Sequence, residues 1–211
     1  YTPKGLYRTY PNLLTYEGVL GMEQGARCKP ENSNWLPFIR NAVGPMDFTP
    51  GSMFSAQPED NRSTGANPMG TGTRAYQMAL YVVFESPLQM LADNPVLYRR
   101  EHPCTEFLAA VPTTWDSLRV LHAACGREVV VARRKGDKWY VGGITNDRPY
   151  TTEIALDFLP AGRTFTMTSF EDGVNADLQA TDYRKRVREV DASTVVKVEM
   201  VRNGGWAAVI E

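Results

Sequence analysis

Two glutamates near the start of the chain have the residue type and surroundings of a catalytic pair. Glu17 and Glu23 lie six residues apart among glycines and aromatic residues. In one straight strand their carboxylates would share a face but lie about 20 Å apart, because each residue rises ~3.3 Å. Gly18 and Gly21 allow the backbone to bend, so a folded segment could bring both acids to one pocket. The simpler interpretation is that both are solvated loop charges.

The first part of the chain has the element order expected at the end of a barrel. We expect a strand at 19–23, a helix at 34–43, a strand at 46–49, a long loop at 51–72 and an apolar helix at 73–84. The last two units of a (β/α)8 barrel would give this order. Active-site groups of such barrels follow the C-terminal ends of strands, which makes Glu23 and Asp47 candidate site residues.

The second part of the chain has an alternating, β-type pattern. About eight strands are predicted, at residues 118–124, 128–133, 138–143, 151–158, 164–171, 185–190, 194–201 and 206–210. Short strands at this spacing predict an antiparallel sandwich or meander. Two helical pieces, 87–93 and 104–110, should form a bridge. We therefore expect an α/β plus all-β chain with a barrel part at 1–86, a helical bridge at 87–111 and a β domain at 112–211.

Composition excludes several classes of partner. The 211 residues are 43% hydrophobic, enough for one large or two small domains with a sizeable core. A formal net charge of -1 gives no electrostatic case for nucleic acid or an anionic membrane, and no apolar run approaches 18 residues. Cys28, Cys104 and Cys125 are an odd number without a close pair, which indicates free or buried thiols.

Four aromatic residues of the β part allow a second interpretation. They could stack on sugar rings, which would make residues 112–211 a carbohydrate-binding module; they are Trp115, Trp139, Tyr140 and Trp206. Aromatic residues in alternating strands are far more often part of the core. The basic run at 184–188 indicates the solvated face of a strand, since no second basic cluster accompanies it.

Several motifs resemble glycoside hydrolase family 97. They are RTYPN at 8–12, EGV at 17–19, GME at 21–23, GPMDFTPG at 44–51 and VPTTWD at 111–116. Members of that family are calcium-dependent α-glycosidases with a (β/α)8 barrel between two β domains. The resemblance is ordered along nearly the whole chain, but it covers only the last part of such an enzyme.

The resemblance implies an exo-acting α-galactosidase or α-glucosidase that cleaves α-linked oligosaccharides. It implies that Glu23 is the general acid and that Glu17 is a Ca²⁺ ligand. Asp47 becomes a substrate-binding residue and the next candidate for the acid. A general acid must hold a proton, which the apolar Met22 and the like-charged Glu17 would favour. A carboxylate also suits a hard cation such as Ca²⁺.

The resemblance also implies that part of the site is missing from this chain. The other calcium ligands and the base or nucleophile would precede Tyr1, so we expect a C-terminal fragment that is inactive alone, or one of two chains that complete each other. Tyr1 and the motif at 17–21 look more like retaining members. Family resemblance implies a periplasmic or secreted enzyme. The alternative function is a non-catalytic carbohydrate-binding or assembly module at 112–211.

Overall fold

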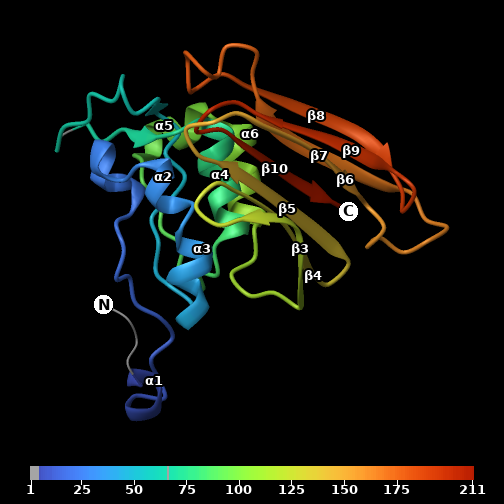
Figure 1. Ribbon diagram of the computed structural model, residues 1–211, viewed down its shortest axis with the longest axis horizontal. Helices are drawn as coiled ribbons and strands as arrows, with labels where there is room; N and C mark the ends of the chain where they lie inside the picture. Colours follow the sequence, from blue (N-terminus) through green and yellow to red (C-terminus); the bar gives the residue numbers. More distant parts are fainter. Residues whose placement is uncertain (1–4, 66) are drawn as a thin grey trace.

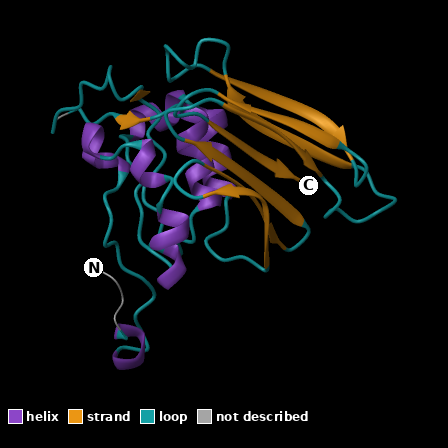
Figure 2. Cartoon of the chain, in the orientation of Figure 1, coloured by secondary structure: helices purple, strands orange, loops and turns teal. Residues whose placement is uncertain are grey.

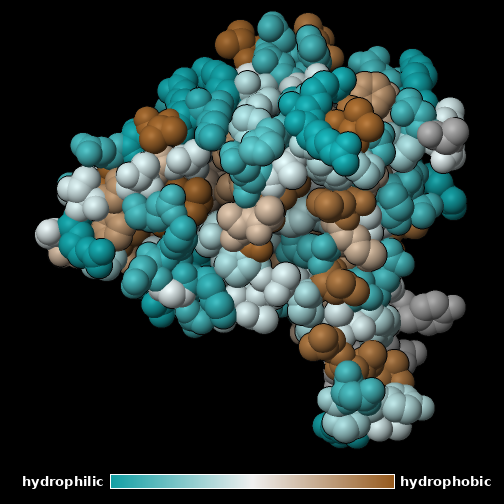
Figure 3. Space-filling model, turned by 180° about the vertical axis from the view of Figure 1, so that it is seen from behind, coloured by the Kyte–Doolittle hydropathy of each residue, from teal (hydrophilic) through white to brown (hydrophobic). Residues whose placement is uncertain are grey.

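Helices and loops lie beside a strongly twisted β part in this protein (Figures 1 and 2). The computed structural model describes residues 5–65 and 67–211, so Tyr1, on which the expected stereochemistry partly rests, lies outside the described residues. The N-terminal segment projects from the body of the molecule (Figure 1). Hydrophobic residues gather on this projection in Figure 3, where Leu6 is 39% and Leu14 is 74% exposed.

The helical part consists mainly of short elements. They are α1 (Leu6–Thr9), the 3-10 helix η1 (Met22–Arg27), α2 (Pro30–Ser33), α3 (Leu36–Ile39), the 3-10 helix η2 (Asn41–Val43), the strands β1 (Ser55–Ala56) and β2 (Gly70–Thr71), α4 (Arg74–Val83), α5 (Pro95–Arg100) and α6 (His102–Ala110). The two strands pair in parallel. The predicted helix at 34–43 is thus broken into two short pieces, and α5 was not predicted.

The two strands predicted near the candidate site are wrong as regular elements. Residues 22–27 form η1, which is kinked where Gly25 has a φ of 59°. Residues 46–49 contribute a single parallel bridge, between Phe48 and Gln89. The segment predicted as a helix at 87–93 is extended instead, because its backbone bonds to residues 48–50. Glycine kinks and pairing between distant segments outweighed the local pattern here.

Helix α4 confirms the apolar helix predicted at 73–84. Thr73 caps its N-terminus by accepting a hydrogen bond of 3.0 Å from the backbone N–H of Tyr76. All ten residues of α4 are buried, as expected for a helix that is covered on every side. The helix packs against β5 and β10 of the β part. It is therefore the element that joins the two parts of the molecule.

The β part confirms the antiparallel sandwich. Its strands are β3 (Ser117–Ala124), β4 (Glu128–Lys135), β5 (Lys138–Thr145), β6 (Tyr150–Ala155), β7 (Phe165–Asp172), β8 (Tyr183–Val190), β9 (Val195–Met200) and β10 (Gly205–Ile210). Six strands form one sheet in the order β3-β4-β5-β10-β7-β8, and β6 pairs with β9 in a second sheet. All pairs of these strands are antiparallel.

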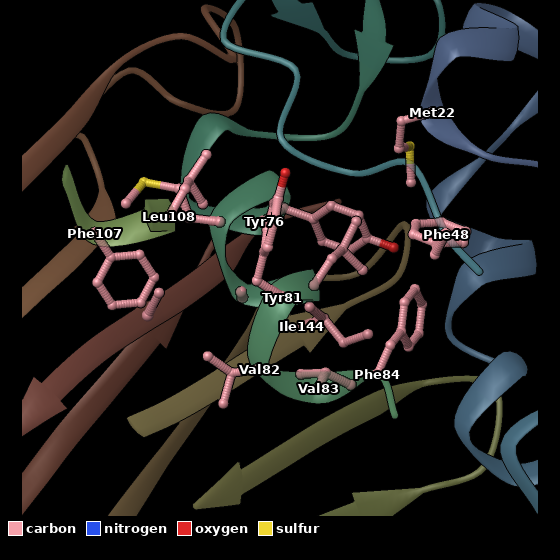
Figure 4. Packing of buried hydrophobic residues seen from close by; sticks show 14 of the residues in the cluster. Met22, Phe48, Tyr76, Tyr81, Val82, Val83, Phe84, Phe107, Leu108 and Ile144 are labelled. Carbon is pink, nitrogen blue, oxygen red and sulfur yellow. The ribbon is translucent and has the colours of Figure 1, made fainter. Parts of the chain in front are cut away.

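Two hydrophobic cores lie on opposite faces of the six-stranded sheet. One fills the sandwich between the two sheets and includes Met167, Val198 and Trp206. The other joins the sheet to the helical part, and Figure 4 shows its members Met22, Tyr76, Phe107 and Ile144. Within the described residues no strand pairing links the two parts. Among the described residues, no strand pairing therefore crosses the predicted domain boundary. One hydrophobic core nevertheless contains residues from both sides of it.

Candidate functional site

Two backbone hydrogen bonds draw the candidate site segments together. The N–H of Asp47 donates to the carbonyl of Tyr16 over 3.2 Å, and the N–H of Met22 donates to the carbonyl of Thr49 over 2.9 Å. Residues 16–22 therefore lie beside residues 47–49. In a straight strand the carboxylates of Glu17 and Glu23 would lie about 20 Å apart. Here the segment bends, so its carboxylates can approach Asp47.

The three predicted carboxylates lie close enough to influence one another. Burial and repulsion by the like charges of Glu23 and Asp47 raise the pKa of Glu17 above its ordinary value. Glu17 is nevertheless exposed, whereas the other two are half-buried. The structure thus brings together all three site residues predicted from the sequence.

The Glu23 side chain folds back over Gly21. A Cβ atom at Gly21 would lie 2.1 Å from Oε2 of Glu23, so any larger residue at this position would force the carboxylate to move. Oε1 of Glu23 accepts a hydrogen bond of 3.3 Å from the side-chain amide of Gln24. Within the described residues Oε2 is buried without a hydrogen-bond partner. One oxygen is therefore hydrogen-bonded, and the other is buried with its hydrogen-bonding capacity unused.

Further polar atoms in the segments that carry Glu17 and Asp47 are buried and unpaired. Within the described chain, Oδ1 of Asp47, the hydroxyl of Tyr16 and Oγ1 of Thr15 have no hydrogen-bond partner. Buried polar atoms are rarely left unsatisfied, so each of these atoms is a candidate to meet a ligand, an ion or another part of the protein. Sequence reasoning missed Thr15 and Tyr16. Their position directly before Glu17 was the only signal.

Arg40 fixes the segment that carries Glu17. Its guanidinium donates to the carbonyls of Tyr16 over 2.8 Å, Glu17 over 3.2 Å and Gly44 over 3.1 Å. It also lies over the ring of Tyr16, 5.2 Å from the ring centroid. Only 5% of Arg40 is exposed. No sequence signal marked this residue, because its partners are main-chain atoms of a distant segment.

A pocket of about 380 Å³ lies beside the candidate site but contains none of its three carboxylates. Its lining residues are Gly18, Val19, Leu20, Cys28, Asn32, Ser33, Leu36, Ile39 and Arg40. The Cys28 thiol donates to the carbonyl of Leu20 over 3.2 Å. Burial raises the pKa of Cys28 to about 12, so the thiol is neutral and a poor nucleophile.

Comparison with known proteins gives the chain its family. Residues 114–211 match the family model described as "Glycosyl-hydrolase 97 C-terminal, oligomerisation". A retaining alpha-galactosidase of Bacteroides thetaiotaomicron is 43% identical over 214 residues, which cover 99% of this chain and 32% of that protein. The chain belongs to glycoside hydrolase family 97. It corresponds to a C-terminal portion of the family's proteins, as the sequence motifs predicted.

Other relatives of this family 97 chain agree. A probable retaining alpha-galactosidase of Streptomyces bingchenggensis is 33% identical and covers 98% of the chain. The solved family 97 enzyme from Pseudoalteromonas sp. strain K8, in complex with acarbose, superposes with a TM-score of 0.85 at 36% identity over 98% of the chain. The chain spans 33% of the length of that enzyme and 30% of the length of the Streptomyces protein.

The carboxylates of this family 97 chain fit a calcium site only in part. Their oxygens are the ligand type that Ca²⁺ prefers, but the ion takes about 6 to 8 of them. Among the residues that the structure describes, no group of three or more His, Cys, Asp or Glu side chains is arranged to hold a metal ion.

Within the described residues, no helix is long and apolar enough to cross a membrane.

Proposed function

We propose that this chain carries the general acid of a longer retaining α-glycosidase that acts on α-linked oligosaccharides, with α-galactosides as the favoured class. The names of the Bacteroides and Streptomyces relatives support the reaction class. The observation that carries the assignment within this chain is the buried, unpartnered Oε2 of Glu23. An α-glucosidase remains the second candidate, since the Pseudoalteromonas relative binds acarbose.

Glu23 would act first as an acid and then as a base. In a retaining glycosidase, one carboxylic acid protonates the leaving oxygen while a second carboxylate, about 5 to 5.5 Å away, attacks the sugar. The Gln24 amide holds Oε1 of Glu23, which leaves Oε2 as the oxygen that delivers the proton. After the leaving group departs, the same oxygen would take a proton from the attacking water. Asp47 would bind substrate beside it.

The rest of the active site would come from elsewhere in the longer enzyme. We propose that residues 1–86 complete a (β/α)8 barrel whose other units precede this chain and supply the nucleophile. Glu17 would then be one ligand of a Ca²⁺ ion held mainly by that other part. Bound calcium would supply Lewis-acid and template chemistry at the substrate. A periplasmic or secreted location is proposed from the glycosidase relatives.

We propose that the β part mediates assembly rather than sugar binding. The family description of residues 114–211 as an oligomerisation region supports this role. Trp139 is only 6% and Trp206 only 1% exposed, so neither ring offers a face to a sugar. Trp115 is half-buried and packs edge-on against Tyr140, with 5.5 Å between the ring centroids.

Glu23→Gln in the longer enzyme tests the catalytic proposal. Turnover of substrates with poor leaving groups should fall about 10²- to 10⁴-fold, the range for a positioned proton donor. Turnover of an activated aryl glycoside should fall much less, because its leaving group needs little protonation. Glu31→Gln, at an exposed position of α2, is the matched control and should change neither rate. Equal losses on both substrates would assign Glu23 a binding or structural role and make Asp47 the next candidate.

A further inference from the structure

The sandwich has four edge strands that could pair with another chain. The six-stranded sheet ends in β3 and β8, and β6 and β9 are both edges of the two-stranded sheet. An unpaired edge presents a row of backbone donors and acceptors to any second strand. Natural proteins protect such edges with charged side chains, so the charge on each edge indicates which one is kept open.

Strand β8 is protected by positive charge. Arg184, Arg186 and Arg188 lie 3.8, 3.4 and 2.7 Å from the carboxylate of Glu171. One carboxylate cannot neutralise three guanidinium groups. Lys185 adds a fourth positive charge to the same strand and Glu189 a single negative one, so the strand stays positive. Two copies of β8 placed side by side would therefore repel each other.

The second sheet is also polar on its outer face. The outward residues of β9 include Lys197 and Glu199, which form an ion pair of 2.7 Å, and both side chains are more than half exposed. On β6, Thr151 and Glu153 are exposed as well. The exposed residues of β6 and β9 are therefore typical of a solvent-facing surface and not of a protein–protein interface.

Strand β3 differs from the other three edges. Its eight residues, SLRVLHAA, contain one formal charge, on Arg119. Leu118 is 50% and Val120 is 61% exposed, and both face a groove of about 340 Å³ whose lining includes Val129 and Val131. Within the described residues, β3 pairs with β4 alone. Residues 117–120 thus form a short edge with two exposed apolar side chains and one charge, ahead of a register shift between Val120 and His122, and this edge can pair with another strand.

We propose that β3 is the edge through which two copies of this chain pair, antiparallel across a two-fold axis. This inference rests on the assembly role proposed for residues 114–211. It specifies that β3 forms the interface and that the two copies of β3 pair antiparallel. A two-fold interface uses the same surface on both copies. Leu118 and Val120 of both copies would lie on one face of a continuous sheet, where cross-strand apolar pairs stabilise the contact.

A matched pair of valine substitutions tests the choice of edge. Val120→Lys places a charge on β3, and Val187→Lys places the same charge on β8, where Val187 is 64% exposed. Sedimentation equilibrium should show a dimer for the unmodified chain and for Val187→Lys. For Val120→Lys the dissociation constant of the dimer should rise roughly 100-fold or more, because like charges would face each other across the axis.

The outcomes separate this inference from the assembly role on which it rests. A monomeric unmodified chain would overturn both. A dimer that survives Val120→Lys would overturn the assignment to β3 alone. If thermal melting shows that Val120→Lys is unfolded, amide hydrogen exchange of the unmodified chain decides instead. Protection of residues 117–124 should then rise with protein concentration while residues 183–190 stay unchanged, and the reverse pattern would contradict the assignment.

Discussion

The hydroxyl of Thr73 donates a hydrogen bond of 2.6 Å to Oδ1 of Asp172, which ties the N-terminus of α4 to the end of β7. The other oxygen of this carboxylate accepts from the backbone N–H groups of Val201, over 2.9 Å, and Gly205, over 3.2 Å. Only 4% of Asp172 is exposed. A single buried carboxylate thus joins the helical part to two segments of the sandwich.

This carboxylate should make stability depend on pH. Burial raises the pKa of Asp172 from 3.8 to about 7, although three donated hydrogen bonds oppose the rise. The folded chain therefore binds the proton more tightly than the unfolded chain. Its contribution to stability is complete below pH 3.8 and is lost as the pH rises to about 7. The free energy of unfolding should fall by roughly 4 kcal/mol over this range.

Asp172→Asn isolates that effect, because the amide cannot titrate. Denaturant unfolding at several pH values should show the decline for the unmodified chain relative to Asp172→Asn. The exposed Asp147→Asn serves as control and should follow the unmodified chain. Parallel pH profiles for the unmodified chain and Asp172→Asn would show that Asp172 does not titrate in this range.

Alanine should destabilise the chain more at Gly142 than at the adjacent Gly143, both on β5. A Cβ at Gly142 would lie 2.8 Å from Cβ of Val82 and 2.9 Å from the carbonyl of Ala79, both on α4. A Cβ at Gly143 would meet only the flexible side chain of Met200, at 3.3 Å, and that of Val130. Gly142→Ala should lose about 1 to 3 kcal/mol of unfolding free energy, because the helix must move off the sheet.

Gly143→Ala is the control for that substitution and should cost less than about 1 kcal/mol, as measured by urea unfolding. The comparison reports how closely α4 lies on the sheet and so how firmly the two parts are joined. Equal effects of the two substitutions would contradict direct packing of α4 against β5.

Calcium should act through Glu17 only in the longer enzyme. Chelation should abolish its activity and added Ca²⁺ should restore it, and Glu17→Gln should raise the Ca²⁺ concentration needed for recovery. The present chain alone should bind Ca²⁺ weakly, with a dissociation constant above about 10⁻⁴ M, since it offers too few of the oxygens that the ion requires. Titration calorimetry on the chain and activity assays on the enzyme measure the two effects. Unchanged activity after thorough chelation would remove Glu17 from the site.

Regular segments were predictable from local pattern. All eight strands of the sandwich and helix α4 lie where alternation and apolar content placed them, within a few residues at their ends. Alternation specifies a strand because one face must be buried, and Thr73 marks a helix start because its side chain caps the first turn. The same local reasoning failed at residues 19–23 and 87–93, where backbone groups pair with distant segments.

By itself, the sequence determined the family, the sandwich and the carboxylates of the candidate site. Tertiary structure decided that Glu17, Glu23 and Asp47 approach one another, because Arg40 and two backbone hydrogen bonds fold segment 16–22 against 47–49. It also decided that Asp172 is buried between the two parts of the molecule. These relationships depend on contacts between residues far apart in the chain, whose energies no local pattern of residue types encodes.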